Sequence, residues 1–469
     1  MSLDTTSQEF ASRSEDEVLA EGQRGWYNNT VTQVVMLGFV CFMGPGLYNA
    51  LNGLGGGGRV DTATNANANA IHYATFAFFA FFAGTVHNYL GPIMTLQLGT
   101  IGYALNVAAY LSTNINPTTR AFIPAAGAIQ GVCAGLLWTA QGSLMLAYPS
   151  EKQKGIFIGI FWSILNMGSV VGASVSLGQN FHSKAFLSVS KGTYIGFLVL
   201  TLIGVVIPMF MANPRKMIRS DGTKVIYPRQ PGLKNALLGL WTTLVNDLWI
   251  ISLFPMFFVS NWFYTWQFNE YNSALFNIRA RSLNNLVYWI AQIFGSVAIA
   301  KLLDQRRLTW RMRAWIGWTV LLVMVFIVHI WAYFYQRLYT RTSVVANPKI
   351  DIYDPQYVGR AFLYVVCGLL DAMWQTTVYW LMGAMSSDPA KLAHFVGFYK
   401  GIQSAGAAGV WRADGIGLPY MNIFISTWIL LVAGLVCAIP VICMRVKDAL
   451  FRKLIILSEC LQSLLQSAL

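Results

Sequence analysis

Long apolar runs alternate with short polar segments along almost the whole chain. A helix needs about 20 apolar residues to cross the hydrocarbon core of a bilayer. Measured by that length, the pattern predicts an all-α membrane protein with about twelve transmembrane helices. The predicted spans lie at 31–52, 71–90, 92–112, 121–147, 155–177, 193–212, 245–266, 284–303, 315–335, 359–382, 394–411 and 421–444. Only Gly91-Pro92 and polar neighbours separate the second span from the third.

The longest of the polar connections, 213–244, carries six basic residues and divides the spans six and six. The sequence therefore predicts two six-helix bundles, at 31–212 and 245–444, joined by a basic cytosolic linker at 213–244. A polar, disordered cytosolic tail is expected at 1–30. The basic and then leucine-rich segment 445–469 predicts an amphipathic cytosolic tail on the membrane surface.

The composition agrees with a membrane protein. Charged residues make up 11% of the chain and hydrophobic residues 55%, whereas a soluble domain has roughly 25% charged residues. The net charge of +13 could suggest nucleic-acid binding, which needs basic residues gathered on one face of a folded domain. Here they lie in short segments between apolar runs, so we expect the lipid bilayer as a partner and no nucleic acid.

The distribution of lysine and arginine predicts the orientation. Short cytosolic loops carry an excess of these residues, and the larger share of the 32 lies in the segments on the same side as the N-terminus. We therefore expect a multi-pass protein with both termini in the cytosol.

The two halves of the chain resemble each other. Four positions in the fifth predicted span match four positions in the eleventh at a constant offset of 238 residues. A parallel repeat of six spans is what the two halves of a major facilitator transporter show. The matched pairs are Phe157 with Phe395, Gly159 with Gly397, Phe161 with Tyr399, and Gly168 with Gly406.

Two charged residues lie well inside predicted spans, Asp371 in the tenth and Lys400 in the eleventh. A charge at the middle of a bilayer costs roughly 2.5–3.5 kcal/mol on insertion scales, so such residues are placed for a reason. Both could line a central cavity, where a carboxylate binds a cation or relays a proton. Alternatively, they form a buried pair, or Lys400 extends its ammonium to the inner interface.

Polar amides and tryptophans accompany these charges. Trp374 and Gln375 follow Asp371 by three and four positions, and Gln403 follows Lys400 by three, which places each set on one face of a helix. Such groups either converge on a solute in an apolar cavity or form hydrogen bonds between helices. The candidates for the cavity wall are Asp371, Lys400, Gln375, Trp374, Gln403, Gln141, Trp138 and Asn166.

Other motifs carry less chemistry. Pro45, between two glycines inside the first span, predicts a kink of the kind that suits alternating access. Asp247, in the first turns of the seventh span, is expected to reach the interface or cap a helix. HExxH, a Ser/His/Asp arrangement and Cys/His clusters are all absent from the sequence, so we expect no metal, no cofactor and no enzymatic activity.

Several stretches resemble the Unc-ninety-three-like branch of the major facilitator superfamily, particularly its fungal members. The resemblance covers nearly all of 31–444. The matching segments are Gly46-Leu47-Tyr48-Asn49-Ala50-Leu51, Trp138-Thr139-Ala140-Gln141-Gly142, Gly155 through Trp162, Asp371-Ala372-Met373-Trp374-Gln375, and Gly397-Phe398-Tyr399-Lys400-Gly401-Ile402-Gln403-Ser404.

The chain departs from the wider superfamily in one loop. His87 to Pro92 lacks the Asp and Arg cluster that usually gates the inner side, which argues against ordinary proton-driven antiport. A partial version follows the eighth span. The gating candidates are therefore Asp304, Arg311 and Arg313, with nearby Arg306 and Arg307, together with Pro45.

The resemblance implies two bundles around a central cavity and leaves two functions open. The first is secondary transport of an unknown small solute by alternating access. The alternative is a non-transporting regulator or escort of a channel or receptor, since animal relatives include a regulator of a muscle potassium channel and an escort for nucleic-acid-sensing receptors. In that case another membrane protein would be the partner.

Overall fold

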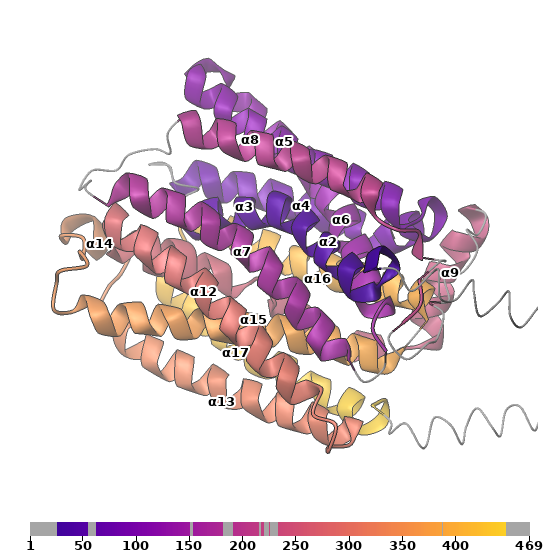
Figure 1. Ribbon diagram of the computed structural model, residues 1–469. Coiled ribbons are helices and arrows are strands. Elements are labelled where there is room, and N and C mark those ends of the chain that lie inside the picture. The colour runs from indigo at the N-terminus through magenta and orange to yellow at the C-terminus, as the bar shows by residue number, and fades with distance from the viewer. Residues whose placement is uncertain are drawn as a thin grey trace, which may run out of the picture.

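The computed structural model describes residues 26–54, 62–150, 153–181, 191–214, 217–219, 225, 233–386 and 388–446. Helices occupy all twelve predicted spans, and within these ranges the only β-type pairing consists of two isolated bridges. Eight helical spans of the described part are long and apolar enough to cross a membrane. Of the others, the sixth is apolar but shorter, at Tyr194–Phe210, and the rest contain more polar residues or are interrupted. All of them pack beside other helices of the bundle (Figure 1). The prediction of an all-α membrane fold is confirmed.

The first half of the chain, from α2 to η5, is called the N-half. A 3₁₀ helix, η1 (Trp26–Asn28), precedes it. Its elements are α2 (Thr30–Cys41), η2 (Phe42–Gly46), α3 (Leu47–Gly53), α4 (Thr62–Leu90), α5 (Pro92–Ile115), η4 (Pro117–Ala121), α6 (Phe122–Ala147), α7 (Lys154–Asn180), α8 (Lys191–Val206) and η5 (Ile207–Phe210).

The second half, from α10 to α17, is called the C-half. Between the two halves lies α9 (Leu233–Asn246), within the segment predicted as a linker. The elements of the C-half are α10 (Trp249–Ser252), α11 (Phe254–Val259), η7 (Thr265–Ser273), α12 (Ile278–Leu303), α13 (Trp310–Gln336), α14 (Ser343–Ala346), α15 (Tyr357–Met385), α16 (Pro389–Gly415) and α17 (Tyr420–Met444).

Local sequence sets the helix ends. Gly91 has a φ of 84°, a left-handed conformation that glycine adopts readily, and Pro92 follows as the first residue of α5. This break at the single residue Gly91 lies at the predicted boundary between the second and third spans. Side-chain oxygens of Asn277, Thr309 and Asp388 accept backbone N–H groups at the starts of α12, α13 and α16.

The first and seventh spans, which are equivalent in a six-plus-six repeat, are both irregular. In the first, α2 and α3 are joined by η2, a π-helical segment that contains Pro45. In the seventh, α10 and α11 are followed by turns and then by η7, a longer π-helical segment. Because proline lacks the N–H that a regular α-helix needs, the predicted irregularity at Pro45 appears as a change of helix type.

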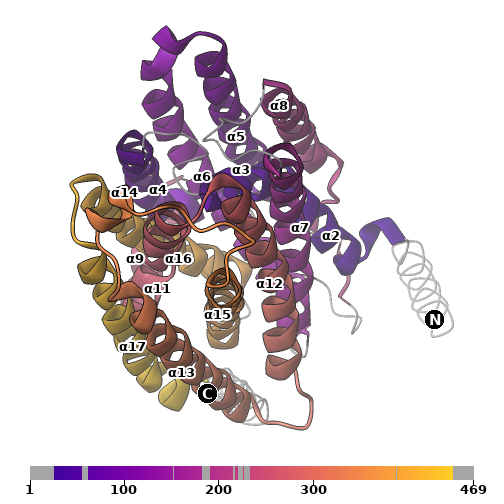
Figure 2. The ribbon, with the colours of Figure 1, turned by 90° about the vertical axis from the view of Figure 1, so that its left-hand side faces the viewer.

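The halves meet along two pairs of helices. Seen along the helix axes, α4 lies beside α16 and α7 lies beside α12 (Figure 2). The repeat explains this arrangement, since the fifth span of each half packs on the second span of the other half.

The matched glycines lie at equivalent contacts. A Cβ on Gly168 or Gly406 would approach the carbonyl oxygen of Phe42 or Phe258, which belong to the first span of the same half. Gly159 and Gly397 instead face the second span of the opposite half. The small residues therefore allow close helix approach at the same places in both halves.

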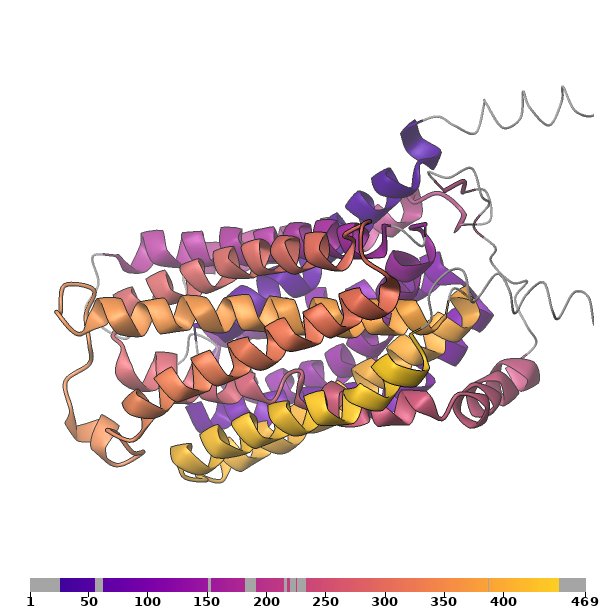
Figure 3. The ribbon, with the colours of Figure 1, turned by 90° about the horizontal axis from the view of Figure 1, so that it is seen from below.

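The bundle has two ends. The proximal end is where α2 begins and α17 ends, and the distal end is where α12 begins. Helix α9 lies at the proximal end, outside the bundle (Figure 3). Exposed apolar side chains of α9 recur at helical spacing, at Leu238, Trp241 and Val245. The predicted tails at 1–30 and 445–469 lie almost entirely outside the described residues.

Candidate functional site

A small cavity lies between the halves, near the middle of the spans. Its volume is about 50 Å³, room for a few water molecules and too little for an organic solute. Residues from both halves form its wall: Pro45, Tyr48, Asn49, His72, Tyr73, Phe76, Tyr103, Trp138 and Trp162 from the N-half, and Asn261, Tyr264, Gln375, Lys400 and Gln403 from the C-half.

Lys400 reaches this cavity inside a group of aromatic rings. Its Nζ lies 4.4 Å from the ring centroid of Trp138, 4.7 Å from that of Tyr399 and 5.4 Å from that of Tyr379. The ammonium also donates to Gln403 Oε1 at 2.8 Å. A cation–π contact contributes about 0.5–2 kcal/mol, so three contacts and a hydrogen bond offset most of the cost of a charge at this depth.

Asp371 lies one layer behind the cavity wall. It is buried, and its carboxylate accepts hydrogen bonds from Tyr288 Oη at 3.0 Å, Gln292 Nε2 at 2.5 Å and Gln375 Nε2 at 3.2 Å. Tyr288 and Gln292 both project from α12, one turn apart. Three donors around one carboxylate suit its ionised form, because an ionised carboxylate only accepts hydrogen bonds.

Two amides connect the acid to the amine. Gln375 donates to Asp371, Gln403 Nε2 donates to Gln375 Oε1 at 3.1 Å, and Lys400 donates to Gln403. Tyr399 Oη donates to the same Gln375 oxygen at 2.9 Å. Among the described residues, no direct ion pair joins Asp371 to Lys400, so the buried-pair alternative is replaced by a hydrogen-bonded chain of four side chains on α15 and α16.

The structure separates the sequence candidates into two sets. Lys400, Gln375, Gln403 and Trp138 lie on the cavity wall, and so does Pro45 from the gating set. The predicted cavity residues Asp371, Trp374, Gln141 and Asn166 are buried but do not line the cavity in this conformation.

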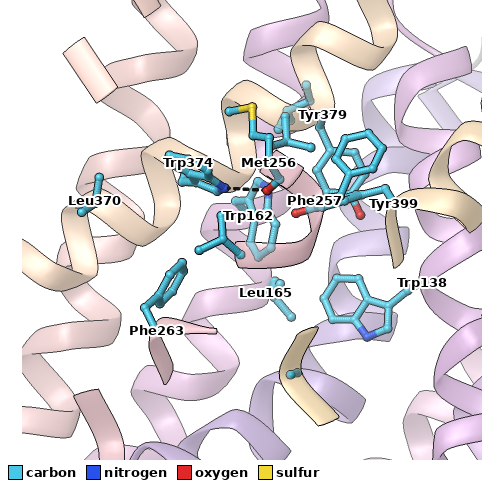
Figure 4. Close-up of a cluster of buried hydrophobic side chains, with 14 of the residues drawn as sticks. Trp138, Trp162, Leu165, Met256, Phe257, Phe263, Leu370, Trp374, Tyr379 and Tyr399 are labelled. Carbon is cyan, nitrogen blue, oxygen red and sulfur yellow. Dashed lines mark hydrogen bonds between the residues drawn. The ribbon is translucent and has the colours of Figure 1, made fainter. Parts of the chain in front are cut away.

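Besides Asp371, two of these residues form hydrogen bonds with other helices, and Asn166 does not. Trp374 turns toward α11 and the residue after it, donating to Ser260 Oγ at 3.0 Å and to Met256 O at 3.3 Å (Figure 4). Gln141 accepts from Tyr379 Oη at 3.4 Å, a contact between the halves. Asn166 is buried on α7, and its amide atoms have no protein partner.

Sequence reasoning missed several residues of the site. Asn261 Oδ1 accepts hydrogen bonds from Gln403 Nε2, at 2.9 Å, and from Gln375 Nε2. Tyr264 Oη also accepts from Gln375 Nε2. These two residues lie in the interrupted seventh span, where a regular helical period does not apply. Tyr288 and Gln292 could have been found, because two polar side chains at i and i+4 in an apolar span indicate a common buried partner.

At the distal end, polar side chains of the C-half bind the end of α3. Asn285 Nδ2 donates to Ala50 O at 2.9 Å, and Asn272 Nδ2 donates to Gly53 O at 3.2 Å. Arg281 donates through Nε and Nη2 to Leu54 O, at 2.9 and 2.6 Å. The last carbonyls of a helix lack partners within it and carry partial negative charge, so these donors cap α3 from the other half.

At the proximal end, charged side chains of each half also bind a helix end of the other half. The carboxylate of Asp304 accepts from the backbone N–H groups of Gly155 and Ile156, at 2.9 and 2.7 Å, at the start of α7. Lys154 Nζ donates to Gly383 O at 2.5 Å near the end of α15. An anion thus lies at a helix N-terminus and a cation at a helix C-terminus, both across the boundary between the halves.

The remaining gating candidates are placed within the C-half. Arg313 is buried, donates to Leu308 O at 3.0 Å and stacks over Trp310. Arg311 is exposed at the start of α13.

The expectation for Asp247, interfacial reach or helix capping, needs correction. Its buried carboxylate forms ion pairs with Lys391 at 2.6 Å and Arg445 at 2.8 Å. The two cations converge on it because the starts of α10 and α16 and the end of α17 meet at the proximal end.

Comparisons with known proteins agree with this fold. The chain matches the family described as "Ion channel regulatory protein UNC-93" over residues 57–442. It is 44% identical to an UNC93-like protein of Schizosaccharomyces pombe, over 90% of this chain and 84% of that protein. UNC93-like protein 1 of Arabidopsis thaliana is 38% identical, over 86% of this chain and 87% of that protein.

A similar solved structure is that of the proton:xylose symporter XylE bound to 6-bromo-6-deoxy-D-glucose, a major facilitator superfamily protein. The TM-score is 0.60 at 12% sequence identity, over 88% of this chain and 94% of that chain. At this identity the likeness shows a shared fold.

Proposed function

Because the chain belongs to the UNC-93 family and has the major facilitator fold, we propose that it is a secondary carrier of a small solute that works by alternating access. The observation that supports this most is the central cavity, which is formed by both halves, contains an ammonium and amides, and is too small for an organic solute in this conformation. The family and the fold both point to a transporter-like membrane protein without enzymatic activity.

The contacts that close the two ends are separate. Arg281, Asn285 and Asn272 hold the distal end, whereas Asp304 and Lys154 hold the proximal end. One set can therefore break while the other remains, as rocking of two rigid halves around a central site requires. We describe the present structure as the occluded state of that cycle.

We further propose that the proximal end faces the cytosol, with both termini on that side. The larger share of lysine and arginine in the short connections lies at this end, as the positive-inside rule requires. Protease protection of tags at either terminus in sealed vesicles tests the orientation.

Flux into proteoliposomes tests the transport proposal. A panel of radiolabelled sugars, amino acids, organic cations and organic anions is compared for the wild type and Asp371→Asn. In the variant an amide NH₂ replaces a carboxylate oxygen and faces the donors Tyr288 and Gln292, so the network that holds Gln375 is disrupted. We expect flux of the transported solute to fall at least tenfold.

The matched control is Asp354→Asn. Asp354 is likewise a hydrogen-bonded carboxylate, with the backbone N–H of Asp351 donating to it at 2.7 Å, but it lies in the loop before α15. Its flux should equal that of the wild type. Absence of flux for every member of the panel with correctly folded wild-type protein would contradict transport.

One observation favours a second function. The family to which the chain belongs is described as an ion channel regulatory protein, so regulation or escort of another membrane protein is the alternative. That alternative predicts a stable, stoichiometric membrane-protein partner after mild detergent extraction, together with no flux over the panel. A carrier predicts flux from the chain alone.

A further inference from the structure

The charge on the cavity wall has one sign. Among the residues that the structure places on this wall, Lys400 is the single lysine or arginine, and the wall contains no carboxylate. The nearest acid along the hydrogen-bonded chain, Asp371, is separated from Lys400 by the amides of Gln375 and Gln403. Its oxygens already accept from three donors, so it does not serve as a direct counter-ion.

The ammonium of Lys400 can donate further hydrogen bonds. It carries three N–H donors, and among the described residues its one hydrogen bond goes to Gln403. Its other close neighbours are aromatic faces, which attract the cation without accepting a conventional hydrogen bond. An anion entering the cavity would meet an ammonium with free donors in a setting of low dielectric constant.

A second donor points to the same kind of ligand. Trp162 lies on the cavity wall and is 4% exposed, and its indole Nε1 has no hydrogen-bond partner. A buried N–H without an acceptor is costly and is uncommon in folded proteins. Two residues of the wall therefore have hydrogen-bond donors that are not fully used, Lys400 from the C-half and Trp162 from the N-half.

The shape of the wall limits the rest of the ligand. Tyr73, Phe76, Tyr103, Trp138 and Trp162 give the N-half side a surface of flat rings. Aromatic rings prefer to pack on other planar groups in offset or edge-to-face arrangements. A planar aromatic body can pack against these rings.

We propose that the solute of this site is an organic anion, a carboxylate on a planar aromatic body, whose carboxylate binds between Lys400 and Trp162. This inference rests on the proposed carrier function for its transport step, but binding alone also tests it. The site would take the ligand when one end opens and the cavity widens, and the carboxylate would supply the acceptors that both donors lack.

Three probes of nearly equal size separate charge from shape. Benzoate is the anion, benzyl alcohol the neutral compound and benzylamine the cation. Binding to the full-length protein in lipid nanodiscs is measured by titration calorimetry, and flux of the same radiolabelled compounds is measured in proteoliposomes. We expect benzoate to bind at least tenfold more tightly than the other two.

The variants test the two donors. Lys400→Gln should weaken benzoate binding about tenfold to a hundredfold, because it removes a charge-assisted hydrogen bond. Lys400→Arg keeps the charge and should retain more of the affinity, and Trp162→Phe keeps the ring but should weaken binding several-fold. The control, Lys301→Gln, removes an exposed lysine of α12 and should leave binding unchanged.

The outcomes are distinct. Benzoate binding that depends on Lys400 without any flux supports the anion site and contradicts the carrier function. Preferred binding of benzyl alcohol or benzylamine, unaffected by Lys400→Gln, overturns the anion site, whether or not the compound is transported. Equal loss of binding in Lys400→Arg and Lys400→Gln with intact folding, or no binding of any probe to the wild type, also overturns it.

Discussion

The contact between α4 and α16 can be weakened by adding a single methyl group. Gly84 of α4 lies near the proximal end, where it faces α16. A Cβ added to Gly84 would lie 2.8 Å from Ala393 O and 2.9 Å from the Cα of His394. Both are backbone atoms, so no side chain can rotate away, and the helices must separate by about 0.6 Å to restore an ordinary contact of 3.4 Å.

The cost of this separation falls on the closed state alone. Extra methyl groups in well-packed interfaces typically cost about 1–3 kcal/mol. Because the helices part when the proximal end opens, the open state does not carry this cost. The ratio of proximally open to occluded protein should therefore rise about 5- to 150-fold in Gly84→Ala.

Electron–electron distance measurements check this prediction. Spin labels at Tyr89 of α4 and Met312 of α13, both exposed near the proximal end, report the distance between the halves. The labels are placed in a background in which native cysteines are replaced. We expect the variant to gain a population at longer distance.

Gly178→Ala is the matched control, since a Cβ on Gly178 of α7 would have no neighbouring atom within 4 Å. Its distance distribution should equal that of the parent protein. An unchanged distribution in Gly84→Ala, or the same change in Gly178→Ala, would refute the steric argument.

Three further substitutions test other contacts. Asn285→Leu leaves the carbonyl of Ala50 and the indole N–H of Trp289 without partners, which costs about 1–3 kcal/mol per group; distance measurements across the distal end should show opening there, and an unchanged distribution would contradict the capping role. Asp247→Asn removes two ion pairs with partly exposed cations and should lower stability by about 1 kcal/mol, seen as a lower thermal midpoint whose difference from the wild type shrinks at high salt. Trp374→Phe loses the bond to a serine hydroxyl and should cost about 1 kcal/mol of stability while flux is retained, whereas loss of flux at full stability would return this residue to the site.

The sequence predicts the membrane part of this fold well, because span length and the cost of buried charge are local properties. Asp371 and Lys400 were found from that cost alone. Helical spacing also predicted a common helix face for Gln375 and Asp371 and for Gln403 and Lys400, and each pair is hydrogen-bonded in the structure.

Spacing alone does not decide which flank of a helix faces the cavity. Trp374 and Gln375 lie on opposite sides of the Asp371 direction, since residues three and four positions along are rotated by about −60° and +40°. Gln375 therefore reaches the cavity, and Trp374 turns to Ser260. Asn261 could not be predicted as a partner because its span changes helix type, and the position of a residue around an irregular helix does not follow from its number.

The two sides of the cavity differ in chemistry, and this asymmetry has an evolutionary consequence. The ammonium and most of the amide groups come from the C-half, as in Lys400 and Gln375, whereas the N-half contributes chiefly rings such as Trp138 and Tyr103. Substitution of one aromatic residue by another in the N-half would change the shape of the cavity without altering the charged and amide groups of the C-half. In the proposed carrier, substitution of rings in the N-half can therefore change the range of solutes while the charged and amide groups of the C-half stay in place.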